Sequence, residues 1–239
     1  MEKHSQIQKN RKKEEKALEY QYHWLEFDDE SLLDYLKKYW VNFRYFHQIN
    51  NIISFKNHRI LDVGSGGPTS VLNIVEGERY GVDPLINEFQ QVYKLNREIH
   101  WYNAYVEDLP FRDHYFDIVI CSNSLDHVED NHKTISEINR VLKHEGKLLL
   151  TVDIFNEKVK RDDKHPYAFM DEDIPKLIWN YNILFFKKSQ TNANLYEYMK
   201  CQNLQKNEIT KPDSKDNLNI PGKKGEVTFS EVVIVAEKI

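Results

Sequence analysis

The sequence predicts an α/β fold in which helices cover both faces of a mostly parallel, doubly wound sheet. Three observations predict it. A short apolar run at residues 60–63 stops at a cluster of Gly, Ser and Pro, and apolar residues then resume at helical spacing. A second short strand pattern ends in Asp83, at the separation of about 20 residues that nucleotide-binding α/β folds use. From Arg59 onward, strand patterns alternate with helix patterns.

Seven strand patterns and four helix patterns follow in order from residue 59. The strand patterns are short apolar runs bounded by turn residues, at 59–63, 79–82, 99–102, 116–121, 147–152, 183–186 and 232–235. The helix patterns carry apolar residues at helical spacing, near 68–76, 86–96, 132–142 and 171–180. Pro68 suits the first turn of its helix. Asp130 or Asn131 is placed to cap the helix near 132–142, and Gly146 to stop it.

Two parts of the chain lie outside this alternating pattern. Residues 1–57 are predicted to form an N-terminal helical extension, and residues 58–239 the α/β domain. Ser31 is expected to cap one helix of the extension, which carries Leu32, Leu36 and Trp40, and residues 41–53 predict a second. The polar stretch 187–229 is predicted to be a long, partly disordered insertion.

Composition narrows the classes of function. The 239 residues carry 33 basic and 38 acidic side chains, for a net charge of −5, which argues against nucleic acid as the main partner. No apolar run approaches the ~20 residues of a membrane span, and the polar start does not resemble a secretory signal. The two cysteines, Cys121 and Cys201, have no metal-binding spacing and suggest no disulfide framework, so a cytoplasmic location is expected.

The stretch from Ile60 to Ser70 is the most informative part of the sequence. Glycines at 64, 66 and 67 let the backbone approach a ligand, and the start of a following helix presents unpaired N–H groups. A glycine turn alone is a weak signal, because many such turns bind nothing. The acid at Asp83 strengthens it, since a carboxylate there is placed to accept hydrogen bonds from ribose hydroxyls.

Five segments together resemble the class I S-adenosylmethionine-dependent methyltransferases, in particular the small-molecule group called type 11. They occur in the family's order within residues 59–154: Leu61-Asp62-Val63-Gly64-Ser65-Gly66, Gly81-Val82-Asp83, Val106-Glu107-Asp108-Leu109-Pro110-Phe111, Phe116-Asp117-Ile118-Val119-Ile120 and Val141-Leu142-Lys143-His144-Glu145-Gly146-Lys147-Leu148. The resemblance implies a Rossmann-like sheet of seven strands whose last strand is antiparallel. It also implies that the N-terminal helices cover the active site.

The resemblance implies S-adenosyl-L-methionine as cofactor and S-adenosyl-L-homocysteine as product. The residues that match cofactor-binding positions are Asp62, Gly64, Ser65, Gly66, Asp83, Pro84, Val106, Glu107 and Asn123. The glycine loop would meet the amino-acid part of the cofactor, with Asp62 orienting the loop or contacting the ammonium group. Asp83 would hold the ribose. Val106 and Glu107 would contact the adenine, and the backbone of Asn123 the ammonium. The family commonly has Asp where this chain has Tyr105, so Glu107 or Asp108 substitutes, or backbone and stacking hold the base.

The reaction implied is methyl transfer to a small molecule, with a hydroxyl of a sugar, glycan precursor or secondary metabolite as the preferred acceptor. A general base helps most when the acceptor is a hydroxyl. His127, with Asp126 adjacent, is the leading candidate, and His165 and Asp153 are alternatives. The structural alternative is that His127 only packs the start of the next helix. No metal is expected.

Two other functions remain open. A nicotinamide-dependent oxidoreductase shares the glycine loop and the acid, but Thr69 stands where the dinucleotide fingerprint needs a third glycine. A methyltransferase-like scaffold without catalysis is the other alternative. The retained set of Asp62, Gly64, Gly66 and Asp83 argues against it, and Tyr105 weakly favours it.

Overall fold

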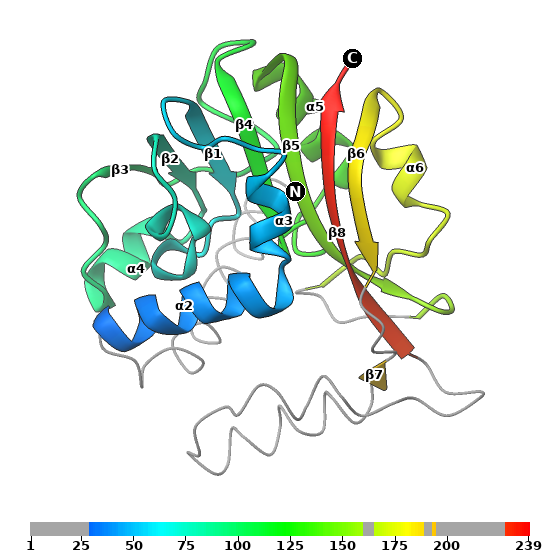
Figure 1. The fold of residues 1–239 in the computed structure, drawn as a ribbon, viewed down its shortest axis with the longest axis horizontal. Coiled ribbons are helices and arrows are strands. Elements are labelled where there is room, and N and C mark those ends of the chain that lie inside the picture. The colour runs from blue at the N-terminus through cyan, green and yellow to red at the C-terminus, as the bar shows by residue number, and fades with distance from the viewer. Residues whose placement is uncertain (1–28, 160–164, 189–192, 195–227) are drawn as a thin grey trace, which may run out of the picture.

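A computed structural model describes residues 29–159, 165–188, 193–194 and 228–239, and Figure 1 shows them as one sheet with helices on both faces. The strands are β1 (Arg59–Val63), β2 (Glu78–Val82), β3 (Ile99–Tyr102), β4 (Phe116–Ser122), β5 (Leu142–Phe155), β6 (Tyr181–Lys188), β7 (Ala193–Asn194) and β8 (Thr228–Lys238). The helices are α2 (Asp29–Phe43), α3 (Phe46–Asn50), η1 (Gly67–Thr69), η2 (Val71–Asn73), α4 (Ile86–Val92), α5 (Asn131–Val141) and α6 (Ile174–Leu177). The predicted α/β class is confirmed.

The strand order is β3-β2-β1-β4-β5-β8-β6, with the two-residue β7 paired to β8 outside this path. Neighbours from β3 through β5 are parallel. Strand β8 is antiparallel to both β5 and β6, and its register with β5 runs from Lys147↔Glu237 to Phe155↔Phe229. The seven strands of the main path and the antiparallel last strand are therefore as predicted.

Alternation along the central strands builds a core on each face of the sheet. Ile60 and Ile120 pack into a cluster with Trp40 and Ile49 of the N-terminal helices. Their sequence neighbours Leu61, Val119 and Cys121 pack into the opposite cluster with Ile138 of α5. A strand buried on both faces needs apolar residues at consecutive positions, which explains why these strands read as continuous apolar runs.

The predicted helix at 68–76 is wrong. Two short 3₁₀ turns, η1 and η2, replace it, and Ser70 between them has an extended ψ of 137°. The Ser70 hydroxyl donates to the Asp62 carboxylate at 2.5 Å and accepts from the backbone N–H of Leu72 at 3.1 Å. A side chain that bonds in both directions stabilises the break between the turns, and helical spacing alone does not reveal it.

The ends of other helices also differ from the predictions. Helix α2 begins at Asp29, so Ser31 lies inside it and is not its N-cap. The pattern at 41–53 is divided between the end of α2 and the short α3, α4 stops at Val92, and the helix expected near 171–180 covers only Ile174–Leu177. The Asp130 cap is confirmed, because its side chain accepts from the N–H of Lys133. Gly146 does not stop α5, since β5 begins at Leu142 and pairs irregularly with β4 around this glycine.

The polar stretch 187–229 begins and ends in strands β6 and β8, and most of it lies outside the described residues, as do residues 1–28 of the predicted extension. The described part of the extension, α2 and α3, packs its apolar residues on the sheet and contacts η1 and η2.

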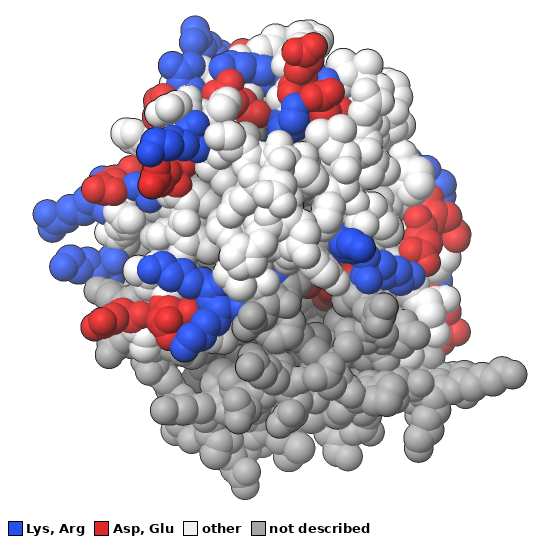
Figure 2. All heavy atoms as spheres, in the orientation of Figure 1, with Lys and Arg blue, Asp and Glu red and all other residues white. Residues whose placement is uncertain are grey.

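The described part of the surface seen in the orientation of Figure 1 has no large area of one charge. Figure 2 shows Lys, Arg, Asp and Glu side chains interspersed around an uncharged centre on this face. Within the described ranges, no helix is both long enough and apolar enough to cross a bilayer.

Candidate functional site

The strand order locates the site. The chain moves outward from β1 through β2 to β3, then crosses back to β4 on the other side of β1. In open α/β sheets, ligands bind at the carboxyl ends of the strands next to such a reversal. The loops after β1, β2 and β4 lie next to this reversal, and they carry most of the cofactor-binding residues predicted from the sequence.

The glycine loop brings the ends of β1 and β4 together. Gly64 has a φ of 62°, and a Cβ built on it would lie 2.4 Å from the Cβ of Ser124. The Ser124 hydroxyl donates to the carbonyl of Val63 at 3.0 Å. A side chain at position 64 would therefore separate the two strand ends, which explains the requirement for glycine.

Asp83 joins the end of β2 to the same loop. Its Oδ2 accepts from the N–H of Gly66 at 3.0 Å and its Oδ1 from the N–H of Leu85 at 2.9 Å. The carboxylate is buried, so its oxygens lie inside the loop and do not face bulk solvent. The predicted convergence of the glycine loop and the acid is present in the fold, with Pro84 directly after the acid.

Asp62 lies behind the loop. Its side chain is buried, and burial raises its pKa to about 7, with a smaller upward effect from the charge of Asp83, while the hydrogen bond from Ser70 lowers it. The described contact orients the loop, which is one of the two roles expected of Asp62. Nearby, the hydroxyl of Ser65 is buried and has no hydrogen-bond partner among the described residues, so this loop has a polar atom to offer a ligand.

The end of β4 carries Asn123 in a left-handed conformation, with a φ of 50°. Its N–H donates to the carbonyl of Thr151 at 3.0 Å and to the Thr151 hydroxyl at 3.1 Å. Asn tolerates this conformation better than most residues. Since the N–H is used within the sheet, a backbone contact from Asn123 to an ammonium group would come from its carbonyl, the oxygen such a group needs.

The segment expected to meet the adenine has a second task. Val106 is buried, while Glu107 accepts from the N–H groups of Glu129 at 2.8 Å and Asp130 at 3.4 Å. The Glu107 carboxylate thus holds the loop after β4. Tyr105, where the family commonly has Asp, has 45% of its surface exposed.

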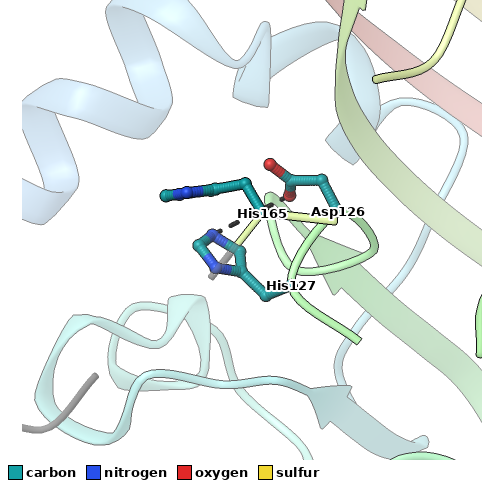
Figure 3. Close-up of side chains that lie close together, drawn as sticks. All are labelled: Asp126, His127 and His165. Atoms are coloured by element: carbon teal, nitrogen blue, oxygen red, sulfur yellow. Dashed lines mark ion pairs between the residues drawn. The ribbon is translucent and has the colours of Figure 1, made fainter. Parts of the chain in front are cut away.

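Three side chains meet at the mouth of the loops after β4 and β5. Asp126 and His127 follow β4, and His165 precedes α6 in the segment after β5 (Figure 3). The Nε2 of His127 lies 3.8 Å from an Asp126 oxygen, and the ring centroids of His127 and His165 are 4.2 Å apart. One ligand atom from each residue falls within 4.8 Å of the others. Sequence reasoning named both histidines, but treated Asp126 only as a neighbour of His127.

The third candidate for a base, Asp153, lies on β5 and belongs to a different environment. Its charge acts on Tyr39 of α2, whose pKa is raised chiefly by burial. Cys121 is a buried free thiol whose pKa burial raises to about 12, so it stays neutral and is a poor nucleophile. A surface hollow of about 510 Å³ lies at the opposite end of the sheet, beside Asn57 and Glu78, where β1 and β2 begin, and none of the predicted site residues lines it.

Comparison with known proteins agrees with this geometry. Residues 61–150 match the family model described as "Methyltransferase domain". The uncharacterized methyltransferase YcgJ of Bacillus subtilis is 32% identical over 100 residues, which cover 39% of this chain and 40% of YcgJ. The match therefore spans about two fifths of the length of that relative.

Two solved structures show how widely the fold is shared. The [4+2]-cyclase SpnF has a TM-score of 0.59 at 16% identity, with 82% of this chain and 80% of that one covered. Phosphoethanolamine N-methyltransferase 2 of Haemonchus contortus, solved with phosphomonomethylethanolamine and S-adenosylhomocysteine, has a TM-score of 0.53 at 15% identity, with 89% and 60% covered. At these identities the likeness concerns the fold alone, and one fold serves several chemistries.

Proposed function

We propose that this chain, whose residues 61–150 match the methyltransferase-domain family model, is a class I S-adenosylmethionine-dependent methyltransferase that transfers a methyl group from S-adenosyl-L-methionine to a small-molecule acceptor. The observation that carries the proposal is the meeting of two strand ends, where the Asp83 carboxylate accepts from the N–H of Gly66. When bound, the cofactor supplies a methyl carbon on a positively charged sulfur. The products are the methylated acceptor, S-adenosyl-L-homocysteine and a proton.

Each part of the proposed cofactor site has a physical role. Asp83 accepts hydrogen bonds from the ribose hydroxyls, with Pro84 bounding the turn, and charge-assisted bonds of this kind contribute about 1.5–3 kcal/mol. Gly64, Ser65 and Gly66 keep the loop backbone close to the amino-acid part. Asp62 holds that loop through Ser70.

The remaining two parts of the proposed site are the adenine and ammonium contacts. Val106 supplies an apolar contact to the adenine, and Glu107 fixes the neighbouring loop. The carbonyl of Asn123 receives the ammonium group, because its N–H already donates to Thr151.

The acceptor is proposed to be a small molecule with a hydroxyl group, such as a sugar, a glycan precursor or a secondary metabolite. Interspersed charge on the face in Figure 2 and the net charge of −5 favour such an acceptor over nucleic acid. His127, half-exposed beside Asp126, is the proposed catalytic residue, in the simplest case taking the acceptor proton as a general base.

The two-part organisation of residues 1–57 and 58–239 also remains a proposal, supported by the start of β1 at Arg59. So does a cytoplasmic location, which rests on composition.

The test is cofactor affinity measured by calorimetry with S-adenosyl-L-homocysteine. Asp83→Asn keeps the shape of the side chain and removes its charge, so binding should weaken by about tenfold to a hundredfold. Asp171→Asn is the matched control, because Asp171 is an exposed carboxylate paired with Lys188, and its binding should equal that of wild type. Equal affinity in Asp83→Asn would remove Asp83 from the site.

Further measurements separate the alternatives. Stronger binding of NADH than of S-adenosyl-L-homocysteine would favour an oxidoreductase. Tight binding of S-adenosyl-L-homocysteine, with no methyl transfer to any acceptor of a broad hydroxyl panel, would favour a scaffold.

A further inference from the structure

The cluster of Asp126, His127 and His165 combines two imidazoles with one carboxylate. The three come from loops after two neighbouring strands, β4 and β5, and their side chains turn toward one another in Figure 3. The potential ligand atoms all lie within 4.8 Å of one another. Histidine nitrogens and carboxylate oxygens are the ligands that transition metal ions take in many enzymes, and the 2-His-1-carboxylate set is a recurrent one.

The two loops that carry the cluster are tied together. The Tyr167 hydroxyl, two residues after His165, donates to the carbonyl of Glu129 at 2.6 Å. From the other side, Glu107 accepts from the N–H of the same Glu129. The segment after β5 is held to the sheet by the bond from the Phe155 N–H to the Phe169 carbonyl at 2.8 Å. These contacts hold the two loops that carry the three side chains next to each other, and a metal site needs such fixed supporting elements.

Burial and charge also fit a cation at this place. The Asp126 side chain is only 6% exposed, whereas that of His127 is 34% exposed. Buried carboxylates are generally paired with cationic groups or coordinate metals. The ring centroids of His127 and His165 are 4.2 Å apart, close enough for nitrogens of both imidazoles to reach one metal ion after a small adjustment.

We infer that Asp126, His127 and His165 bind one divalent transition metal ion of the Zn²⁺, Fe²⁺ or Co²⁺ type. Bonds of about 2.0–2.2 Å bring ligand atoms closer than the present spacing, so binding draws the two rings and the carboxylate inward by roughly 1 Å. His127 has the exposure to make that movement. Three protein ligands leave at least one coordination position open.

The open coordination position offers a place for the acceptor of the proposed methyl transfer. This step rests on the proposed function, whereas the metal site itself does not. The acceptor hydroxyl oxygen binds the metal, which favours loss of its proton to solvent, as a metal ion does for bound water. The oxygen then forms the new bond to the methyl carbon while the carbon–sulfur bond breaks and its electron pair stays on sulfur. His127 contributes as a ligand in this scheme, in place of acting as a general base.

The experiment uses the untagged full chain, stripped with a chelator and titrated with Co²⁺ without cofactor or acceptor. Wild type should bind one Co²⁺ per chain and show visible absorption bands from nitrogen and oxygen ligation. His165→Ala and Asp126→Asn should each weaken binding by at least about tenfold to a hundredfold, because loss of an outer-shell partner already costs that much and these residues are the proposed ligands themselves. His132→Ala is the control, since His132 is an exposed histidine in the first turn of α5 and outside the cluster.

Co²⁺ binding that is equal in wild type, His165→Ala and Asp126→Asn would overturn the metal site. Affinity for S-adenosyl-L-homocysteine, measured on the same variants, should be unchanged, so failure of the metal site is distinguishable from failure of the cofactor site. Methyl transfer should stop in the stripped protein and return with metal. Full activity after stripping would overturn the role of the metal at the acceptor and restore His127 as a general base.

Discussion

At the scale of single residues, burial gives Asp62 an acid–base behaviour that its sequence context does not reveal. Its pKa rises from 3.8 to about 7, chiefly because the carboxylate loses its hydration, and the bond from Ser70 only partly offsets this. At a pH between these two pKa values, the Asp62 carboxyl is therefore protonated in the folded protein and ionised in the unfolded chain. Stability from this group is fully present below pH 3.8 and is lost as the pH rises to about 7.

Asp62→Asn tests this sign. At pH 5 the folded carboxyl is still mostly neutral and only part of this stability has been lost, so the two melting temperatures should differ only slightly. At pH 8 the wild type carries a buried charge that Asn lacks, and the variant should melt several degrees higher, as measured by calorimetry in both buffers.

The matched control for this prediction is Asp113→Asn. Arg140 lowers the pKa of Asp113, so that side chain is ionised throughout the range, and its effect should be the same at both pH values. A difference between Asp62→Asn and wild type that does not change with pH would contradict the raised pKa.

At the scale of elements, Arg140 connects α5 to the loop that precedes β4. It donates to the carbonyls of Leu109 and Phe111 at 3.0 and 2.7 Å and to the carboxylates of Asp113 and Glu137. Glu137 in turn accepts from the N–H of Leu109. The helix and the loop therefore share one hydrogen-bonded network, which holds the start of β4 against the helix.

Arg140→Met should destabilise the protein by at least about 2 kcal/mol, because several charge-assisted bonds are lost and Glu137 keeps its charge without its main partner. The measurement is denaturant unfolding at neutral pH. Lys176→Met is the comparison, since Lys176 forms an exposed ion pair with Asp173, and its change should stay below about 1 kcal/mol. Equal small effects would mean that the Arg140 network contributes little.

At the scale of the whole molecule, β8 is an interior strand of the sheet although it follows all the other strands in the sequence. Strand β8 lies between β5 and β6, and its residues from Val232 to Ala236 are almost fully buried. Strand β6 is one of the two edge strands of this path, and its Ile183, Leu184 and Phe186 are about half exposed. Strand β8 therefore belongs to the core of the sheet.

Ile234→Ala and Ile183→Ala compare the two strands with the same chemical change. Ile234 has no exposed surface, so its truncation should cost about 2–5 kcal/mol of unfolding free energy. Ile183 is 50% exposed, and its truncation should cost less than about 1 kcal/mol. Denaturant melts of both variants measure the difference. Similar costs would contradict the central place of β8.

The sequence alone determined three features: the positions of the main strands, the order of the proposed cofactor-binding segments along the chain, and the closeness of the glycine loop to Asp83. These follow from local patterns, because a buried parallel strand must be apolar at consecutive positions and a close loop must contain glycine. Contacts between distant segments decided the rest. The hydrogen bond between Ser70 and Asp62 stabilises a break where a helix was expected. Glu107 binds the backbone of the loop after β4 in addition to its predicted place near a ligand. The hydrogen bond between the backbones of Phe155 and Phe169 holds the segment that places His165 beside His127. Only the tertiary structure shows such arrangements. Each depends on a hydrogen bond or on burial between distant residues, and no repeating sequence pattern reveals which distant residues meet.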